Sequence, residues 1–296
     1  MATSEAVVLE QAVGHPGDKW EALKQRIQDE SIQKFSAIQD DWLDLMWCLD
    51  AYRRVGVPPR GMGKLAQADS TRLDAVYRGK GNWFATALAL LLGNQTSHQL
   101  ASRGRVHGFS QMHQIDVAWP PREVDPLICL ETKVTGAPAY GHYPARKATA
   151  DWTNRRKELK FAATDLKLFR RQQETVIEHW DVWRSNAAPK TFFLWAARMS
   201  PRDKLNDMVQ EVQYLVKSYL EGAGIIAWET NSNGDGYQPM TIPPVDRVST
   251  ADDVLYRIAS EIKLIAPPGQ QPPPPQTPTT KLIDVTAISE DPSSTQ

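Results

Sequence analysis

A chain of 296 residues, 41% hydrophobic and 23% charged, has the composition of a globular protein with room for one large domain or two small ones. The longest apolar stretch, Phe84–Leu92, is too short to cross a bilayer, and the N-terminus lacks a basic region followed by an apolar run. Two cysteines, Cys48 and Cys129, exclude a disulfide framework and a zinc knuckle. We therefore expect a cytoplasmic protein without a membrane partner.

The net charge of −1 argues mildly against binding to nucleic acid, but the charges are unevenly distributed. Residues 145–171 hold nine Lys or Arg residues and only three acids, Asp151, Glu158 and Asp165. This segment carries an excess of positive charge that acidic residues elsewhere conceal in the total.

The first 17 residues contain the loop Gly14-His15-Pro16-Gly17 and are expected to have little order. Apolar spacing predicts helices over residues 18–55, 70–92, 151–184, 204–221 and 252–264. Short apolar runs predict strands over 109–119, 127–134, 191–197 and 225–228. Strands that alternate with helices indicate an α/β fold with a mixed central sheet flanked by helices.

The chain divides by composition into four parts. Residues 1–17 form a disordered N-terminus, 18–70 a helical N-terminal region, and 71–266 an α/β core. Residues 267–296 begin with a proline-rich stretch and end in an acidic one rich in Ser and Thr, which predicts a disordered tail.

The candidate chemistry lies on the first two predicted strands. Asp116 stands between Ile115 and Val117, and the second strand ends in Glu131-Thr132-Lys133. Because side chains alternate along a strand, Glu131 and Lys133 point to one face and Leu130 to the other. A hairpin would then bring Asp116 beside Glu131, so that two carboxylates and an ammonium converge.

Such a group suits metal-assisted hydrolysis of a phosphodiester. Carboxylate oxygens are the ligands that Mg²⁺ prefers, and the Thr132 carbonyl is a candidate third ligand. Lys133 would orient the attacking water and balance developing negative charge. The alternative interpretation is an ion pair between Glu131 and Lys133 on a solvated face of the sheet.

An Asp on one strand followed by Glu-X-Lys on the next resembles the active-site motif of the PD-(D/E)XK, or restriction-endonuclease-like, nucleases. The resemblance covers about residues 75–230. It implies a restriction-endonuclease-like core, catalysis by Asp116, Glu131 and Lys133, metal binding by Asp116 and Glu131, and Mg²⁺ as cofactor with Mn²⁺ as a substitute. It also implies a DNA endonuclease of bacterial restriction or phage defence.

The sequence departs from that motif in two places. Ile115 precedes Asp116 where many members have Pro, and Ala85 follows Gly81-Asn82-Trp83-Phe84 where many have a helical Glu. Asn82 or Asp74 is therefore a candidate in place of that acid, and the number of metal ions stays open. Gln114 lies two residues before Asp116 and shares its face of the strand, which makes it a candidate at the rim of the site.

DNA is the expected partner, and basic side chains around the motif would contact its phosphates. The candidates are Arg103, Arg105, Arg146, Lys147, Arg155, Arg156, Lys157 and Lys160. A solvated amphipathic helix explains the basic segment equally well. A homodimer is expected if both strands are cut. A catalytically inactive protein of this fold that binds DNA or another protein, and an unrelated α/β structural or adaptor protein, are the alternative readings.

Overall fold

The computed structural model describes residues 4–62, 69–121, 126–141, 144–176, 189–201 and 203–266, without the side chains of 69–75, 107 and 169–176. Its helices are α1 (Ser4–Val13), α2 (Pro16–Asp29), α3 (Gln39–Val55), α4 (Asp69–Thr96), α5 (Trp152–Val176), α7 (Leu205–Ser218) and α8 (Ala251–Ile265), with a short 3₁₀ helix at Phe35–Ala37. Its strands are β1 (Ala101–His107), β2 (Met112–Trp119), β3 (Ile128–Thr135), β4 (Lys190–Arg198), β5 (Gly222–Thr230), β6 (Tyr237–Pro239) and β7 (Val248–Ser249).

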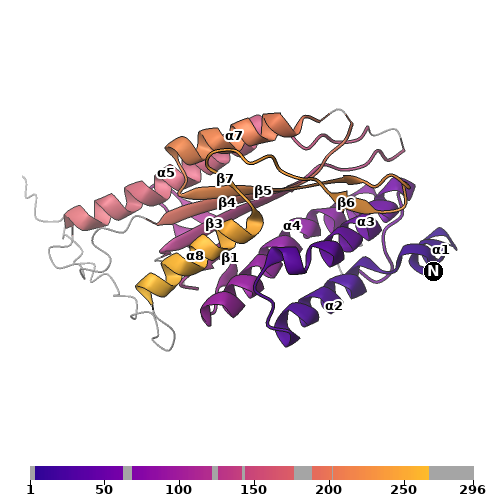
Figure 1. Cartoon of the computed structure of the whole chain (residues 1–296), viewed down its shortest axis with the longest axis horizontal. Helices are drawn as coiled ribbons and strands as arrows, with labels where there is room; N and C mark the ends of the chain where they lie inside the picture. The colour runs from indigo at the N-terminus through magenta and orange to yellow at the C-terminus, as the bar shows by residue number, and fades with distance from the viewer. Residues whose placement is uncertain are drawn as a thin grey trace, which may run out of the picture.

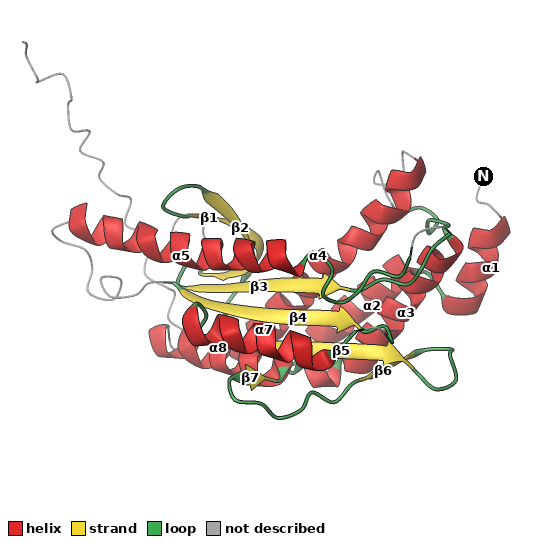
Figure 2. Cartoon of the chain, turned by 90° about the horizontal axis from the view of Figure 1, so that it is seen from above, coloured by secondary structure: helices red, strands yellow, loops and turns green. Residues whose placement is uncertain are grey.

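The strands form one mixed sheet in the order β1-β2-β3-β4-β5-β6, with β7 also paired to β5. Strands β1, β2 and β3 are antiparallel neighbours, whereas β3, β4 and β5 run parallel. Figure 2 shows the parallel strands side by side, with β1 and β2 at one edge. The predicted α/β fold with a mixed sheet and an N-terminal helical region is confirmed.

Helices cover both faces of the sheet because its central strands are apolar on both sides. Phe192 and Leu194 of β4 pack in a core shared with α2, α3, α4 and α8. The alternate residues Phe193 and Trp195 pack in a second core with α5 and α7. Figure 1 shows these two helical layers on opposite sides of the strands.

The structure differs from the sequence-based expectation at the N-terminus. Residues 4–13 form helix α1, although little order is expected before residue 18. Tyr52 of α3 donates its hydroxyl to the Gly14 carbonyl at 3.2 Å, and Arg60 pairs with Glu10 at 2.5 Å. These contacts join α1 to α3 and to the segment after it, and no periodicity within residues 1–17 reveals them.

Two other elements also differ from expectation. Residues 101–107, for which the sequence predicts no strand, form β1 because their backbone pairs with β2; among the described side chains of this strand, Val106 alone is buried. Helix α4 extends to Thr96, beyond the predicted end at residue 92, and continues without a break through Gly79 and Gly81. The predicted tail at 267–296 and the end of the basic helix at 177–184 lie outside the described residues. In the described ranges, no helix combines the length and apolar character that a membrane span requires.

Candidate active site and cationic cleft

The candidate site lies where β2 and β3 part. The two strands pair from Trp119–Ile128 to Val117–Leu130, and Asp116 and Glu131 are the next residues along. Beyond that point the Asp116 carboxylate, rather than a backbone carbonyl of β2, accepts hydrogen bonds from β3. Its Oδ2 accepts the Thr132 backbone N–H at 2.8 Å and the Thr132 hydroxyl at 2.9 Å. These bonds fix Asp116 against the edge of β3.

The Lys133 ammonium joins the two carboxylates. Its Nζ lies 3.3 Å from Glu131 Oε2 and 3.9 Å from Asp116 Oδ2. The three side chains are 18% (Glu131), 24% (Asp116) and 23% (Lys133) exposed, so each is partly shielded but reachable from solvent. The structure therefore brings together the acid–acid–amine group that the sequence predicts, with Lys133 at its centre.

The group borders more than one hollow, and its two carboxylates do not face the same one. Asp116 and Thr132 line a cleft of about 640 Å³, whereas Glu131 and Gln114 line a smaller hollow of about 230 Å³. Lys133 lines both. A ligand in the large cleft would thus meet Asp116 and the ammonium directly.

Burial raises the pKa of Glu131 to about 7. The Lys133 ammonium opposes this shift, while the negative charges of Asp116 and Glu158 add to it. Glu158 was not among the predicted site residues, yet it lines the smaller hollow beside Glu131. A carboxyl with this pKa exchanges a proton readily near neutral pH, as groups at functional sites often do.

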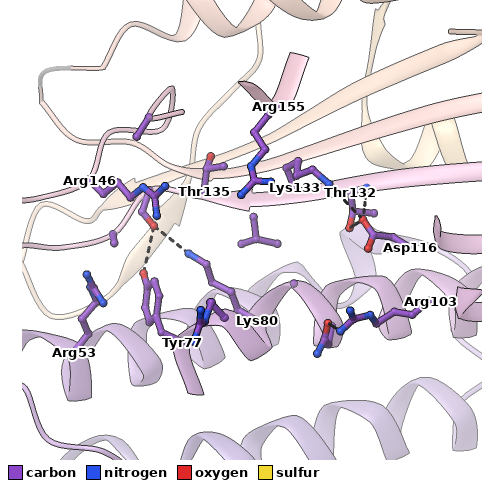
Figure 3. Close-up of a pocket in the computed structure, with 17 residues that line it drawn as sticks. Arg53, Tyr77, Lys80, Arg103, Asp116, Thr132, Lys133, Thr135, Arg146 and Arg155 are labelled. Atoms are coloured by element: carbon purple, nitrogen blue, oxygen red, sulfur yellow. Dashed lines mark hydrogen bonds and ion pairs between the residues drawn. The ribbon is translucent and has the colours of Figure 1, made fainter. Parts of the chain in front are cut away.

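The large cleft is strongly cationic. It runs between α4 on one side and β3 with the loop after it on the other, and Figure 3 shows basic side chains on both walls. Asp116 is the one acid among the described residues that line it. The basic lining residues are Arg53, Arg78, Lys80, Arg103, Lys133, Arg146 and Arg155. A low-dielectric hollow with this charge attracts polyanions.

Three of the predicted phosphate-binding residues line this cleft: Arg103, Arg146 and Arg155. Two others face α7 instead, where Arg156 pairs with Glu211 at 2.9 Å and Lys160 donates to the Tyr214 hydroxyl at 3.1 Å. The remaining three, Arg105, Lys147 and Lys157, are exposed and do not line the cleft.

Asn82 and Gln114, the predicted additional residues, meet through Arg103. The Arg103 guanidinium donates one hydrogen bond to Asn82 Oδ1 of α4 and another, of 3.0 Å, to Gln114 Oε1 of β2. Arg103 adopts a φ of 59° in the middle of β1, an unusual conformation for a non-glycine residue. Asn82 and Gln114 thus hold a cleft-lining arginine.

The available oxygen donors suit a divalent cation. Within the described residues, Asp116 Oδ1 and Glu131 Oε1 have no hydrogen-bond partner, which leaves one oxygen of each carboxylate for a ligand. The Thr132 N–H and hydroxyl are directed to Asp116, and a role for its carbonyl stays a prediction. In the same ranges, no group of three His, Cys, Asp or Glu side chains gathers.

Sequence reasoning missed the cations that the N-terminal helices contribute. Arg53 lies in the last turn of α3, while Arg78 and Lys80 belong to α4, and all three line the cleft. The available signal was the pair Arg78 and Lys80 directly before the apolar run that starts at Phe84.

Comparisons with protein-family models, with curated proteins and with solved structures find no match to this chain. The fold and the site define a mixed α/β protein with a cationic cleft lined at one end by Asp116 and Lys133, with Glu131 in the adjoining hollow.

Proposed function

We propose that the protein is a divalent-metal-dependent nuclease that hydrolyses phosphodiester bonds of DNA, with a restriction-endonuclease-like core. The observation that carries this proposal is that the Asp116 and Glu131 carboxylates both lie within 4 Å of the Lys133 ammonium, which together with Asp116 lines one end of a cationic cleft. Phosphates of the backbone would lie along the basic walls. A role in bacterial restriction or phage defence is part of the proposal by resemblance to the PD-(D/E)XK nucleases.

Asp116 and Glu131 would hold the metal ion, Mg²⁺ or Mn²⁺, through the carboxylate oxygens that have no hydrogen-bond partner within the described residues. A bound divalent ion supplies Lewis-acid chemistry, since it activates water and offsets negative charge on phosphate. The donor set fits because both side chains are partly exposed and carry hard oxygen ligands.

The chain's own groups then have distinct tasks. Thr132 orients Asp116 through two hydrogen bonds. Lys133 lines the cleft, and its ammonium lies close to both carboxylates. This ammonium would orient water and balance the negative charge that develops on the phosphate. Arg103 and Arg155, from opposite walls, would position the strand.

Nicking of supercoiled plasmid with Mg²⁺ or Mn²⁺ tests this function. Wild-type protein should nick, whereas Asp116→Asn and Lys133→Met should not. Lys263→Met is the matched control, because Glu261-Ile262-Lys263 repeats the Glu-X-Lys pattern on the surface of α8. Equal nicking by all four proteins would contradict the assignment.

One observation favours a second candidate function, a DNA-binding protein without hydrolysis. The described site does not gather three potential metal-ligating side chains, and Lys133 already pairs with both Asp116 and Glu131. For such a protein, Asp116→Asn and Lys133→Met would leave the biological effect intact while DNA binding persists. Loss of that effect in both variants would exclude it.

A further inference from the structure

The end of the cleft away from Asp116 surrounds a buried lysine. Lys80 of α4 is only 8% exposed, and its ammonium donates to the Gly136 carbonyl at 3.1 Å. The same ammonium lies 4.2 Å from the centre of the Tyr77 ring. Figure 3 shows Lys80 and Tyr77 below this end of the cleft, with Arg146 opposite and Arg53 beside them.

Positive charge exceeds negative charge around Lys80. Four groups act on its ammonium: Asp50 and Arg53 of α3, Arg146 of the loop after β3, and Arg198 of β4. The Asp50 carboxylate is shared among the hydroxyls of Tyr77 and Tyr237 and the Arg198 guanidinium. Arg146 also pairs with Asp151. Among the described residues, cations still outnumber carboxylates here, and a buried ammonium such as that of Lys80 is costly in such surroundings without an anionic ligand.

We propose that Lys80, Arg53 and Arg146 form a phosphate-binding subsite that holds one phosphate of a nucleic-acid strand while another phosphate lies at Asp116 and Lys133. Arginine forks and a lysine point charge together suit phosphate oxygens. Gly136, which anchors Lys80, comes four residues after Thr132 and directly after the end of β3, or about 13 Å away at 3.3 Å per residue. The identity of the ligand as a strand rests on the proposed nuclease function.

The source of the phosphate is either an internal phosphodiester or a terminal monophosphate. Binding of a fluorescent single-stranded oligonucleotide in EDTA, with a phosphorylated or a hydroxyl end, distinguishes the two. Tighter binding of the phosphorylated oligonucleotide by wild type but not by Lys80→Met identifies a terminal phosphate. Equal, Lys80-dependent binding of both oligonucleotides identifies an internal one.

Lys80→Met should weaken binding of the oligonucleotide about tenfold or more, because charge-assisted hydrogen bonds are lost. Lys263→Met, which removes the same charge from the surface of α8, should change it far less. The free Lys80→Met protein should melt at the wild-type temperature or above, since a buried charge is removed. A lower melting temperature with unchanged affinity would show that Lys80 is structural and would overturn the subsite.

The pH dependence of binding gives an independent readout. Burial lowers the pKa of Lys80 to about 8, with Asp50 opposing the shift and the three arginines adding to it. Burial raises the pKa of the adjacent Tyr77, so this hydroxyl stays neutral. Wild-type affinity should therefore fall between pH 7 and 9 more than that of Lys80→Arg, which stays charged. Parallel curves would overturn the proposal.

Failure of the subsite and failure of the nuclease function give different results. Asp116→Asn should abolish cleavage yet keep Lys80-dependent binding. Asp116-dependent cleavage with wild-type binding by Lys80→Met would overturn the subsite alone. Lys80-dependent binding without cleavage by wild type would overturn the nuclease function and leave the subsite standing.

Discussion

Thr132 donates two hydrogen bonds to the same carboxylate oxygen of Asp116, one from its backbone and one from its hydroxyl. This relationship connects the middle of β2 to β3 at the point where the strands part. It makes the position of Asp116 dependent on the residue between Glu131 and Lys133, which is otherwise free to vary in a Glu-X-Lys motif.

Thr132→Val keeps the shape of the side chain and removes one of the two bonds. We expect kcat for DNA cleavage to fall about threefold to tenfold, since a hydrogen bond of this kind contributes about 1 kcal/mol. Thr132→Ser retains the hydroxyl and should restore most of the rate. Equal rates for Thr132→Val and wild type would show that the hydroxyl does not position Asp116.

Glu131 should make the protein less stable as pH rises. Its pKa is raised from 4.5 to about 7, so the folded state binds the proton more tightly than the unfolded state. The resulting stability is present in acid and is lost as pH rises from 4.5 through 7, by on the order of 1–3 kcal/mol. Urea unfolding at pH 5 and pH 8 should show this loss in wild type and not in Glu131→Gln. A matching loss in Glu131→Gln would place its origin elsewhere.

Gly136 supports the cleft through its backbone. It has a φ of 76°, and a Cβ there would lie 2.2 Å from the Arg198 carbonyl oxygen. Gly234 has the same φ of 76° with open space around it, which makes it a matched control. Gly234→Ala should cost about 1–2 kcal/mol from backbone conformation alone.

Gly136→Ala should cost clearly more than Gly234→Ala, because the Arg198 backbone must also move. The Gly136 carbonyl accepts hydrogen bonds from Lys80 and Tyr77, so DNA affinity should fall as well. Urea unfolding and DNA binding measure the two effects. Equal losses of stability in the two variants would contradict the close contact.

Much of this fold can be predicted from the sequence because the elements are locally distinct. Strands β3, β4 and β5 are short apolar runs, and α5 repeats apolar residues at helical spacing. Strand β1 is not predictable in this way, since Ala101–His107 contains Arg103, Gly104 and Arg105 and gains its structure from pairing with β2.

The candidate site, like the fold, is predictable from the sequence only where its residues lie close together in the chain. Asp116, Glu131 and Lys133 are local to one strand pair, so alternation of side chains places them together. Arg53 and Lys80 belong to helices far away in sequence, where a basic residue is typical of a solvated face. Only the packing of α4 against Gly136 buries Lys80 and places it in the cleft.

The helix that carries Arg155 is fixed by a buried pair. His113 Nε2 lies 2.8 Å from Asp165 Oδ2, and Ser110 donates its backbone N–H and hydroxyl to Oδ1. Burial alone would raise the pKa of Asp165, but hydrogen bonds from His113 and Ser110 outweigh it and lower the pKa.

Asp165→Asn should therefore destabilise the protein at neutral pH by about 1–3 kcal/mol. A lowered pKa contributes stability that is present above the ordinary value of 3.8 and is lost as pH falls below it, so the penalty should shrink in acid. Urea unfolding at pH 7 and pH 3 checks this. A penalty that is the same at both pH values would rule out the charge of Asp165 as the cause.

The most direct test of the hydrolytic centre is the single-turnover rate of DNA cleavage in Mg²⁺ by Asp116→Asn, Glu131→Gln, Lys133→Met and the Asp116→Asn/Lys133→Met double variant. Because the three groups would act as a unit, each single change should lower the rate about a hundredfold or more, and the double variant should be no slower than the slower single one. A rate within a few-fold of wild type for any of the three, with Lys263→Met as reference, would contradict the centre.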